Sequence, residues 1–142
     1  MAAGADVIVA QGWEAGGHVR GAVTTLALVP AVVDAVSPTP VVAAGGIADG
    51  RGVAAALALG ASGVWIGTRF VASTEAFAHP EFKQRVVEAN TDDTFHTTLF
   101  DRGWANAPHR ALRNSTIEMW EQAGRPPSGQ RPREGEVVAQ LA

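Results

Sequence analysis

The sequence contains no cysteine, and this absence removes several classes of chemistry at once. Disulfide bonds, thiolate nucleophiles and cysteine-ligated metal sites are all excluded. The chain also has no excess of basic residues, since 11 Lys and Arg stand against 14 Asp and Glu, for a formal net charge of -3. A nucleic-acid-binding domain would call for a basic face. We therefore expect no nucleic acid partner.

Long apolar runs are missing as well. No run approaches the roughly 20 residues that span a bilayer, so we expect no membrane association. The opening MAAGADVIVA lacks the basic segment and the long apolar segment of a signal peptide. A composition of 46% hydrophobic and 18% charged residues is that of a globular protein. Together with the missing cysteine, these features favour a cytoplasmic protein.

Three short apolar runs each lead into residues with little side chain. The runs are Val7–Ala10, Val41–Ala44 and Val64–Ile66, and the small residues after them are Gly12, Gly45 and Gly46, and Gly67 and Thr68. Continuous apolar runs without alternation are typical of strands buried on both faces of a parallel sheet. Buried helix segments are the alternative, but the runs are short and end near glycine.

Helices are predicted between and after these runs. Pro30 suits the first turn of a helix, Asp49 is a favourable N-cap, and Gly60 stands where a left-handed C-cap belongs. The segments 79–90 and 110–124 also have amphipathic helical patterns. The alternation of strand and helix predicts an α/β fold built from right-handed βαβ units.

We expect residues 1–142 to form one partial domain. The Pro-, Gly- and Arg-rich stretch 124–136 is predicted to be an exposed loop, because its prolines neither donate hydrogen bonds nor continue a helix. Trp104 and Trp120 are expected to anchor the core. The histidines at 79, 96 and 109 have no metal-like spacing, so we interpret them as structural or surface residues and expect no metal site.

The residues after the second and third runs are suited to binding an anion. In parallel α/β proteins, ligands bind at the carboxyl ends of the strands. Gly45, Gly46 and Gly67 let main-chain N–H groups approach a ligand closely, and Thr68 adds a hydroxyl donor. The helix after Asp49 adds the partial positive charge of its N-terminus. The pattern predicts a phosphate site, with tight turns alone as the alternative.

His18 stands directly after Gly16 and Gly17 and just beyond the first run. An imidazole titrates near neutral pH and can accept and return a proton, so this placement favours a general base. The alternative is a loop histidine without a function. Glu14 either orients the ring or is a solvated charge, and Arg20 contacts either a substrate or a helix end. The sequence leaves both choices open.

Three long stretches carry a family resemblance. GADVIVAQGWEAGGH, TPVVAAGGIADGRGVAAALALGASGVWIGTRF and TTLFDRGWANAPHRALRN together resemble the C-terminal half of nitronate monooxygenases, a family formerly called 2-nitropropane dioxygenases. The resemblance runs from Gly4 to about Ala139. Flavin-dependent enoyl-acyl-carrier-protein reductases share the first two stretches, whereas the third is closer to the nitronate branch.

The resemblance implies FMN bound in a (β/α)8 TIM barrel and assigns roles to individual residues. His18 matches the catalytic histidine after the sixth strand. The positions that match FMN contacts are Gln11, Gly16, Gly45, Gly46, Trp65, Ile66, Gly67 and Thr68. Related proteins often carry Gln where this chain has Trp65, a difference that a main-chain contact would survive and a side-chain contact would not.

The resemblance also predicts a truncated barrel. Such barrels usually need about 250 residues and eight strands, and this chain supplies strands six to eight with the helices that follow. We therefore expect weak or absent FMN binding by the isolated chain, and self-association through the open edge of its first strand.

The implied reaction is oxidation of an alkyl nitronate by dioxygen to a carbonyl compound and nitrite. The flavin supplies the redox chemistry and the protein supplies orientation. Two alternatives remain, an enoyl-thioester reductase that uses FMN and NAD(P)H, and a non-catalytic remnant.

Overall fold

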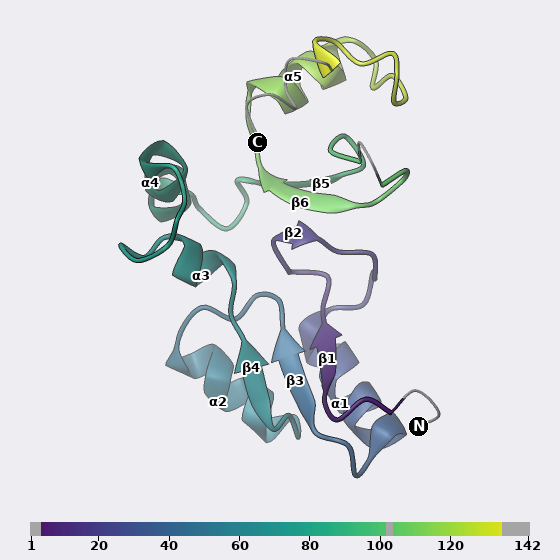
Figure 1. Ribbon diagram of the computed structural model, residues 1–142, viewed down its shortest axis with the longest axis vertical. Coiled ribbons are helices and arrows are strands. Elements are labelled where there is room, and N and C mark those ends of the chain that lie inside the picture. Colours follow the sequence, from purple (N-terminus) through teal and green to yellow (C-terminus); the bar gives the residue numbers. More distant parts are fainter. Residues whose placement is uncertain (1–3, 102–103, 135–142) are drawn as a thin grey trace.

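The chain forms two small sheets of different topology, together with the helices that accompany them, as Figure 1 shows. The computed structural model describes residues 4–101 and 104–134. The first sheet is parallel, with the strand order β1-β3-β4. Its elements, in chain order, are β1 (Ile8–Gln11), α1 (Thr25–Val36), β3 (Val41–Ala44), α2 (Gly50–Ala58) and β4 (Gly63–Trp65). The predicted α/β fold is confirmed, and each of the three predicted strands is found within one residue of its expected bounds.

The second sheet is antiparallel and was not predicted. Its strand order is β2-β6-β5, with β2 (Gly17–His18), β5 (Thr94–Thr97) and β6 (His109–Leu112). These strands are short and carry His, Arg and Thr, so they show no apolar run. The remaining helices are α3 (Thr68–Val71), α4 (Pro80–Glu88) and α5 (Ser115–Gln122).

The helix predicted over 79–90 is confirmed by α4, but the one predicted over 110–124 is partly wrong. Its first residues form β6, and the helix α5 begins only at Ser115. The side chain of Asn114 accepts a hydrogen bond from the Ile117 N–H at 3.1 Å and so fixes this start. An N-cap asparagine favours a helix boundary at this point.

The prediction for Pro30 is also wrong, because α1 begins at Thr25 and contains Pro30 in its interior. Glu14, from the loop after β1, accepts hydrogen bonds from the Thr25 N–H at 2.8 Å and from the Thr25 hydroxyl at 3.0 Å. This remote carboxylate satisfies a backbone donor of the first helical turn, and Val29 is fully buried against the sheet. Tertiary contacts therefore outweigh the backbone hydrogen bond that proline removes.

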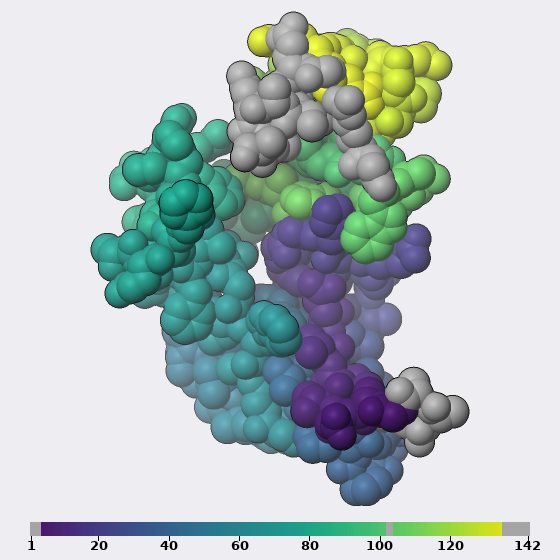
Figure 2. All heavy atoms as spheres, in the orientation of Figure 1, coloured from purple at the N-terminus to yellow at the C-terminus, as the bar shows by residue number. Residues whose placement is uncertain are grey.

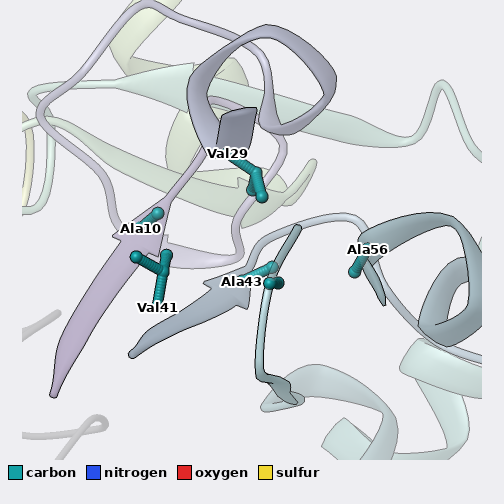
Figure 3. Packing of buried hydrophobic residues seen from close by; sticks show 6 residues of the cluster. Ala10, Val29, Val41, Ala43 and Ala56 are labelled. Carbon is teal, nitrogen blue, oxygen red and sulfur yellow. The ribbon is translucent and has the colours of Figure 1, made fainter. Parts of the chain in front are cut away.

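The core of the first unit lies between the sheet and the helices α1 and α2 (Figure 3). Its buried members are Ala10, Val29, Val41, Ala43, Ala56 and Ala61. The small side chains of this cluster allow the helices to approach the strands closely. A second cluster, Leu99, Ile117 and Trp120, fixes α5 on the antiparallel sheet, which confirms Trp120 as a core residue.

The opposite face of the parallel sheet is open, so burial of the strands on both faces is not found. Val7 and Val9 are 49% and 45% exposed, and Trp65 is 63% exposed. The strands β1 and β4 each pair on one side only, and the described residues form no closed barrel.

The stretch 124–130 is mostly exposed, but Arg131 turns inward, and its side chain is only 6% exposed. Residues 135 and 136, which end the predicted loop, lie outside the described residues. Within the described part of the chain, no helix has the length and apolarity that a bilayer crossing requires.

Candidate active site

The loops that follow the three parallel strands lie against one another. A Cβ atom on Gly16 would stand 2.6 Å from the Thr68 hydroxyl oxygen, so the loop after β1 touches the start of α3. A Cβ atom on Gly46 would stand 3.0 Å from Cβ of Glu14. Parallel strands bring their carboxyl ends to one edge, and glycine lets the connecting loops meet there. The structure thus brings together Gly16, Gly46 and Thr68.

The glycines after β3 serve the turn and leave donors free. Gly45 and Gly46 have φ values of +101° and +71°, a region that strains other residues. The N–H groups of Gly46, Gly67 and Thr68 donate to no other described residue. A role in a tight turn and a role in binding an anion are therefore compatible at this edge.

The N-terminus of α2 is less suited to an anion than its sequence indicates. Asp49 is confirmed as the N-cap, and its carboxylate accepts from the N–H groups of Arg51 at 3.0 Å and Gly52 at 3.2 Å. Hydrogen bonds from the Arg51 side chain and from the Gly52 N–H hold the pKa of Asp49 below its usual range. Two N–H groups at the start of α2 are thus already engaged by Asp49, whereas those of Gly46 and Thr68 are not engaged by another described residue.

His18 lies in β2, exposed, at the junction of the two sheets (Figure 1). Gln11 Nε2 donates to the His18 carbonyl at 3.2 Å. The imidazole lies between two rings, with its centroid 5.0 Å from that of Trp104 and 4.7 Å from that of His109. Trp104 is 55% exposed, so its expected place in the core is wrong. Its ring packs on His18 instead.

His109 is the cross-strand partner of His18 and was predicted only as a structural or surface residue. Burial, and then the neighbouring imidazoles of His18 and His96, lower the pKa of His109. Its Nδ1 atom is buried and has no hydrogen-bond partner among the described residues. Burial therefore favours the neutral form of His109, and His18 is the more exposed of the two rings.

The other face of the antiparallel sheet holds the loop that carries His18. Arg110 Nη2 donates to the Trp13 carbonyl at 2.8 Å, and its guanidinium lies 5.2 Å from the Trp13 ring centroid. The His96 ring lies 4.0 Å from that of Trp13, and His96 Nε2 is 3.2 Å from the Val19 carbonyl oxygen. Sequence patterns offered no signal for these contacts, which join residues more than 75 positions apart.

The remaining candidate residues divide between structural and exposed positions. Glu14 neither contacts His18 nor is purely solvated, since it caps α1. Arg20 and Arg69 are exposed and form no ion pair with another described residue. Trp65 ends β4, in register with Ala44, and Ile66 follows it.

No three His, Asp or Glu side chains in the described ranges are placed to hold a metal ion. A recess separates the segment with α3 and α4 from the loop with β2 in the space-filling view (Figure 2). The residues Gly46 and Thr68 both lie against the loop between β1 and β2, at Glu14 and Gly16 respectively.

A family model described as nitronate monooxygenase matches residues 1–138. The chain belongs to the nitronate monooxygenase family. The family consists of flavin oxidoreductases, so the resemblance carried by the three sequence stretches is confirmed.

Individual relatives agree with this family assignment. The chain is 53% identical over 128 residues to a protein of Bacillus subtilis named as a nitronate monooxygenase, covering 84% of this chain and 35% of that protein. Among solved structures, FabK of Thermotoga maritima is 48% identical with a TM-score of 0.76, over 85% of this chain and 37% of FabK. The nitroalkane oxidase of Streptomyces ansochromogenes is 35% identical with a TM-score of 0.77, over 99% of this chain and 41% of that one.

The chain spans about a third of the length of the curated relatives it matches, 32% to 35% of the first three. The structural neighbours FabK and nitroalkane oxidase are TIM-barrel enzymes. In this chain the parallel strands β1, β3 and β4 form an open sheet. This short coverage is consistent with the predicted truncation.

Proposed function

We propose that this chain carries the phosphate side of an FMN site and the general base of a nitronate monooxygenase. The reaction is the oxidation of an alkyl nitronate by dioxygen to a carbonyl compound and nitrite. The observation that carries the proposal is the meeting of the Gly16 loop with Thr68 and of the Gly46 turn with Glu14 at one edge of the parallel sheet. That edge lies beside the loop that leads to His18.

The residues at this edge fit an anionic phosphate. Gly46, Gly67 and Thr68 offer N–H groups that no other described residue uses, and Thr68 adds a hydroxyl. The two nearest carboxylates, Glu14 and Asp49, are each engaged at the start of a helix. The positions proposed to contact FMN are Gln11, Gly16, Gly45, Gly46, Trp65, Ile66, Gly67 and Thr68.

His18 acts as the base in this proposal. FMN, when bound, supplies the acceptor for the electrons that leave the nitronate. The exposed imidazole of His18 accepts the proton from the carbon next to a nitro group, or balances the charge of a nitronate that arrives as an anion. Such proton transfer contributes roughly 10²–10⁴-fold to a rate. The rings of Trp104 and His109 restrict where the imidazole can point.

A comparison of FMN with riboflavin tests the phosphate site. We expect weak binding of FMN, because the partners from earlier barrel strands are not in this chain, and still weaker binding of riboflavin, which lacks the phosphate. Replacing Thr68 by Val should reduce the difference, whereas Thr91→Val, at an exposed position, should leave it unchanged. Equal affinities for the two flavins, measured by flavin fluorescence, would refute the phosphate site.

Nitrite release from propionate-3-nitronate tests the base. With FMN present, His18→Asn should lower the rate by about 10²–10⁴-fold without changing FMN affinity. The matched control is His79→Asn, which keeps an acceptor where His79 caps α4. A chain that binds FMN but releases no nitrite supports the non-catalytic alternative.

The likeness to FabK supports a second candidate function. FabK, an enoyl-acyl-carrier-protein reductase, shares 48% identity with this chain. Oxidation of NAD(P)H that depends on a crotonyl thioester would favour an enoyl-thioester reductase over the nitronate reaction. The stretch 97–114, which resembles the nitronate branch, places this candidate second.

We also propose that the chain self-associates through the open side of its parallel sheet. β1 and β4 are both edge strands among the described residues, and the exposed side chains of Val7, Val9 and Trp65 lie along the sheet. Unpaired edges and apolar faces favour association with another chain. Sedimentation velocity should show a dimer or larger species, and a monomer at high concentration would contradict this. The cytoplasmic location stays a prediction.

A further inference from the structure

The strand β6 places a single arginine against the loop that leads from β1 to His18. Arg110 makes two contacts with the same residue of that loop, a hydrogen bond from Nη2 to the Trp13 carbonyl at 2.8 Å and a stacking contact at 5.2 Å from the Trp13 ring centroid. A charged donor forms a stronger hydrogen bond than a neutral one. Arg110 therefore fixes both the backbone and the side chain of Trp13.

The guanidinium of Arg110 is also anchored through its other terminal nitrogen. Nη1 donates to the Thr94 hydroxyl of β5 at 3.2 Å. The residue stands in register with Gly17 of β2 and His96 of β5, on the neighbouring row to the His18–His109 pair. Successive side chains of a strand point to opposite faces. The pair of rings thus occupies one face and Arg110 the other.

A second tether lies on the far side of His18. The Val19 N–H donates to the Pro108 carbonyl at 3.1 Å, and the Val19 carbonyl oxygen is 3.2 Å from His96 Nε2. The loop is therefore held before His18 through Trp13 and after it through Val19. The tether at Trp13 depends on the charged side chain of Arg110. That side chain can be replaced without altering the backbone of β6.

We propose that Arg110 is a positioning residue for His18. Arg110 fixes Trp13, and the loop that contains Trp13 determines where the imidazole lies relative to the proposed anion site at Gly46 and Thr68. The inference rests on the proposed role of His18 as the general base. Arg110 itself is not a catalytic residue, since its guanidinium reaches Trp13 and Thr94 on the face opposite the His18 ring.

Hydrogen exchange tests the positioning without any reference to catalysis. Arg110→Ala should increase amide exchange over residues 12–19 and leave residues 41–44 unchanged, because β3 belongs to the other sheet. Arg110→Lys keeps the charge but loses the second donor and the planar stack, so it should give a smaller increase and guards against a variant that fails to fold. Arg113→Ala is the matched control, since Arg113 pairs with Glu121 and does not touch the loop.

Kinetics test the consequence for His18. A misplacement of about 1 Å can lower a rate by about 10²-fold, so Arg110→Ala should lower kcat by up to that factor and leave KM for the nitronate and affinity for FMN unchanged. Added guanidinium, far below unfolding concentrations, should restore part of kcat in Arg110→Ala and none in His18→Asn.

The outcomes separate the two proposals. Unchanged exchange over 12–19 in both Arg110 variants overturns the positioning role. Faster exchange together with an unchanged kcat also overturns it, because the loop would then move without affecting the base. A wild-type chain that releases no nitrite contradicts the proposed function instead, and in that case the exchange result alone decides whether Arg110 fixes the loop.

Discussion

Replacement of Asp101 by Ala would remove the partner of a buried cation. Arg131 Nη1 lies 2.6 Å from Asp101 Oδ1, and the two side chains are 6% and 4% exposed. The same guanidinium donates to the carbonyls of Leu99 at 2.7 Å and Thr98 at 3.3 Å. The other carboxylate oxygen accepts from the Asn106 N–H at 2.8 Å. The Arg131–Asp101 pair therefore ties Thr98, Leu99 and Asn106 to the segment after α5.

The expected cost is large because the variant removes the closer counter-ion of a buried charge and leaves only Glu134, whose Oε1 lies 3.9 Å from Arg131 Nη1. Breaking a buried ion pair by removing one partner costs about 3–5 kcal/mol, a large part of the roughly 5–15 kcal/mol that stabilises a typical domain. Arg51→Ala is the matched control. Its ion pair with Asp49 is exposed, with Arg51 93% accessible, and exposed pairs contribute about 0–1 kcal/mol.

Urea unfolding followed by circular dichroism measures both variants. The prediction also has a pH dependence, because the hydrogen bond from Arg131 lowers the pKa of Asp101 in the folded chain. A carboxylate with a depressed pKa stabilises the fold above its unfolded value of about 3.9 and loses that contribution as the pH falls through the folded value. The wild type and Asp101→Ala should therefore converge in acid. A loss at pH 7 no larger than that of Arg51→Ala would refute the reasoning.

Two further predictions concern the loop after β1 and the His18 pair. Glu14→Ala should lower the free energy of unfolding in urea by about 0.5–2 kcal/mol, the cost of a lost helix cap. Glu14→Gln keeps an acceptor for Thr25 and should lower it less. Equal losses in the two variants would contradict the capping role. Burial lowers the pKa of His109, so the unfolded chain binds the proton more readily and stability should fall as the pH drops below about 6.5. His109→Phe should remove that part of the slope in urea midpoints measured from pH 5 to 8, and parallel slopes would count against it.

The parallel sheet could be predicted from the sequence because its information is local. The three apolar runs, the N-cap Asp49 and the left-handed Gly60 each specify their own element within a few residues. The start of α1 could not be predicted in this way, because its first turn depends on Glu14, eleven positions earlier. Pro30 then gave the wrong boundary.

The antiparallel sheet escaped prediction for a related reason. β2 has two residues, and its pairing with β6 joins Gly17 to Arg110 across most of the chain. Neither strand has an apolar run, and the sequence HRAL at the start of the predicted helix fits either structure. Trp104 was likewise expected to anchor the core, whereas the structure packs it on His18. The roles of His18 and of the FMN-contacting positions stay predictions.

Gly17 has a consequence that reaches beyond its own turn. Gly16 lies against Thr68 at the end of the parallel sheet, and the next residue, Gly17, already pairs with Arg110 in the antiparallel sheet and has a φ of +79°. A change in the torsion angles of this one residue would shift His18 relative to the edge that carries Gly46 and Thr68. The distance between these two parts of the candidate site can therefore be altered at a single residue.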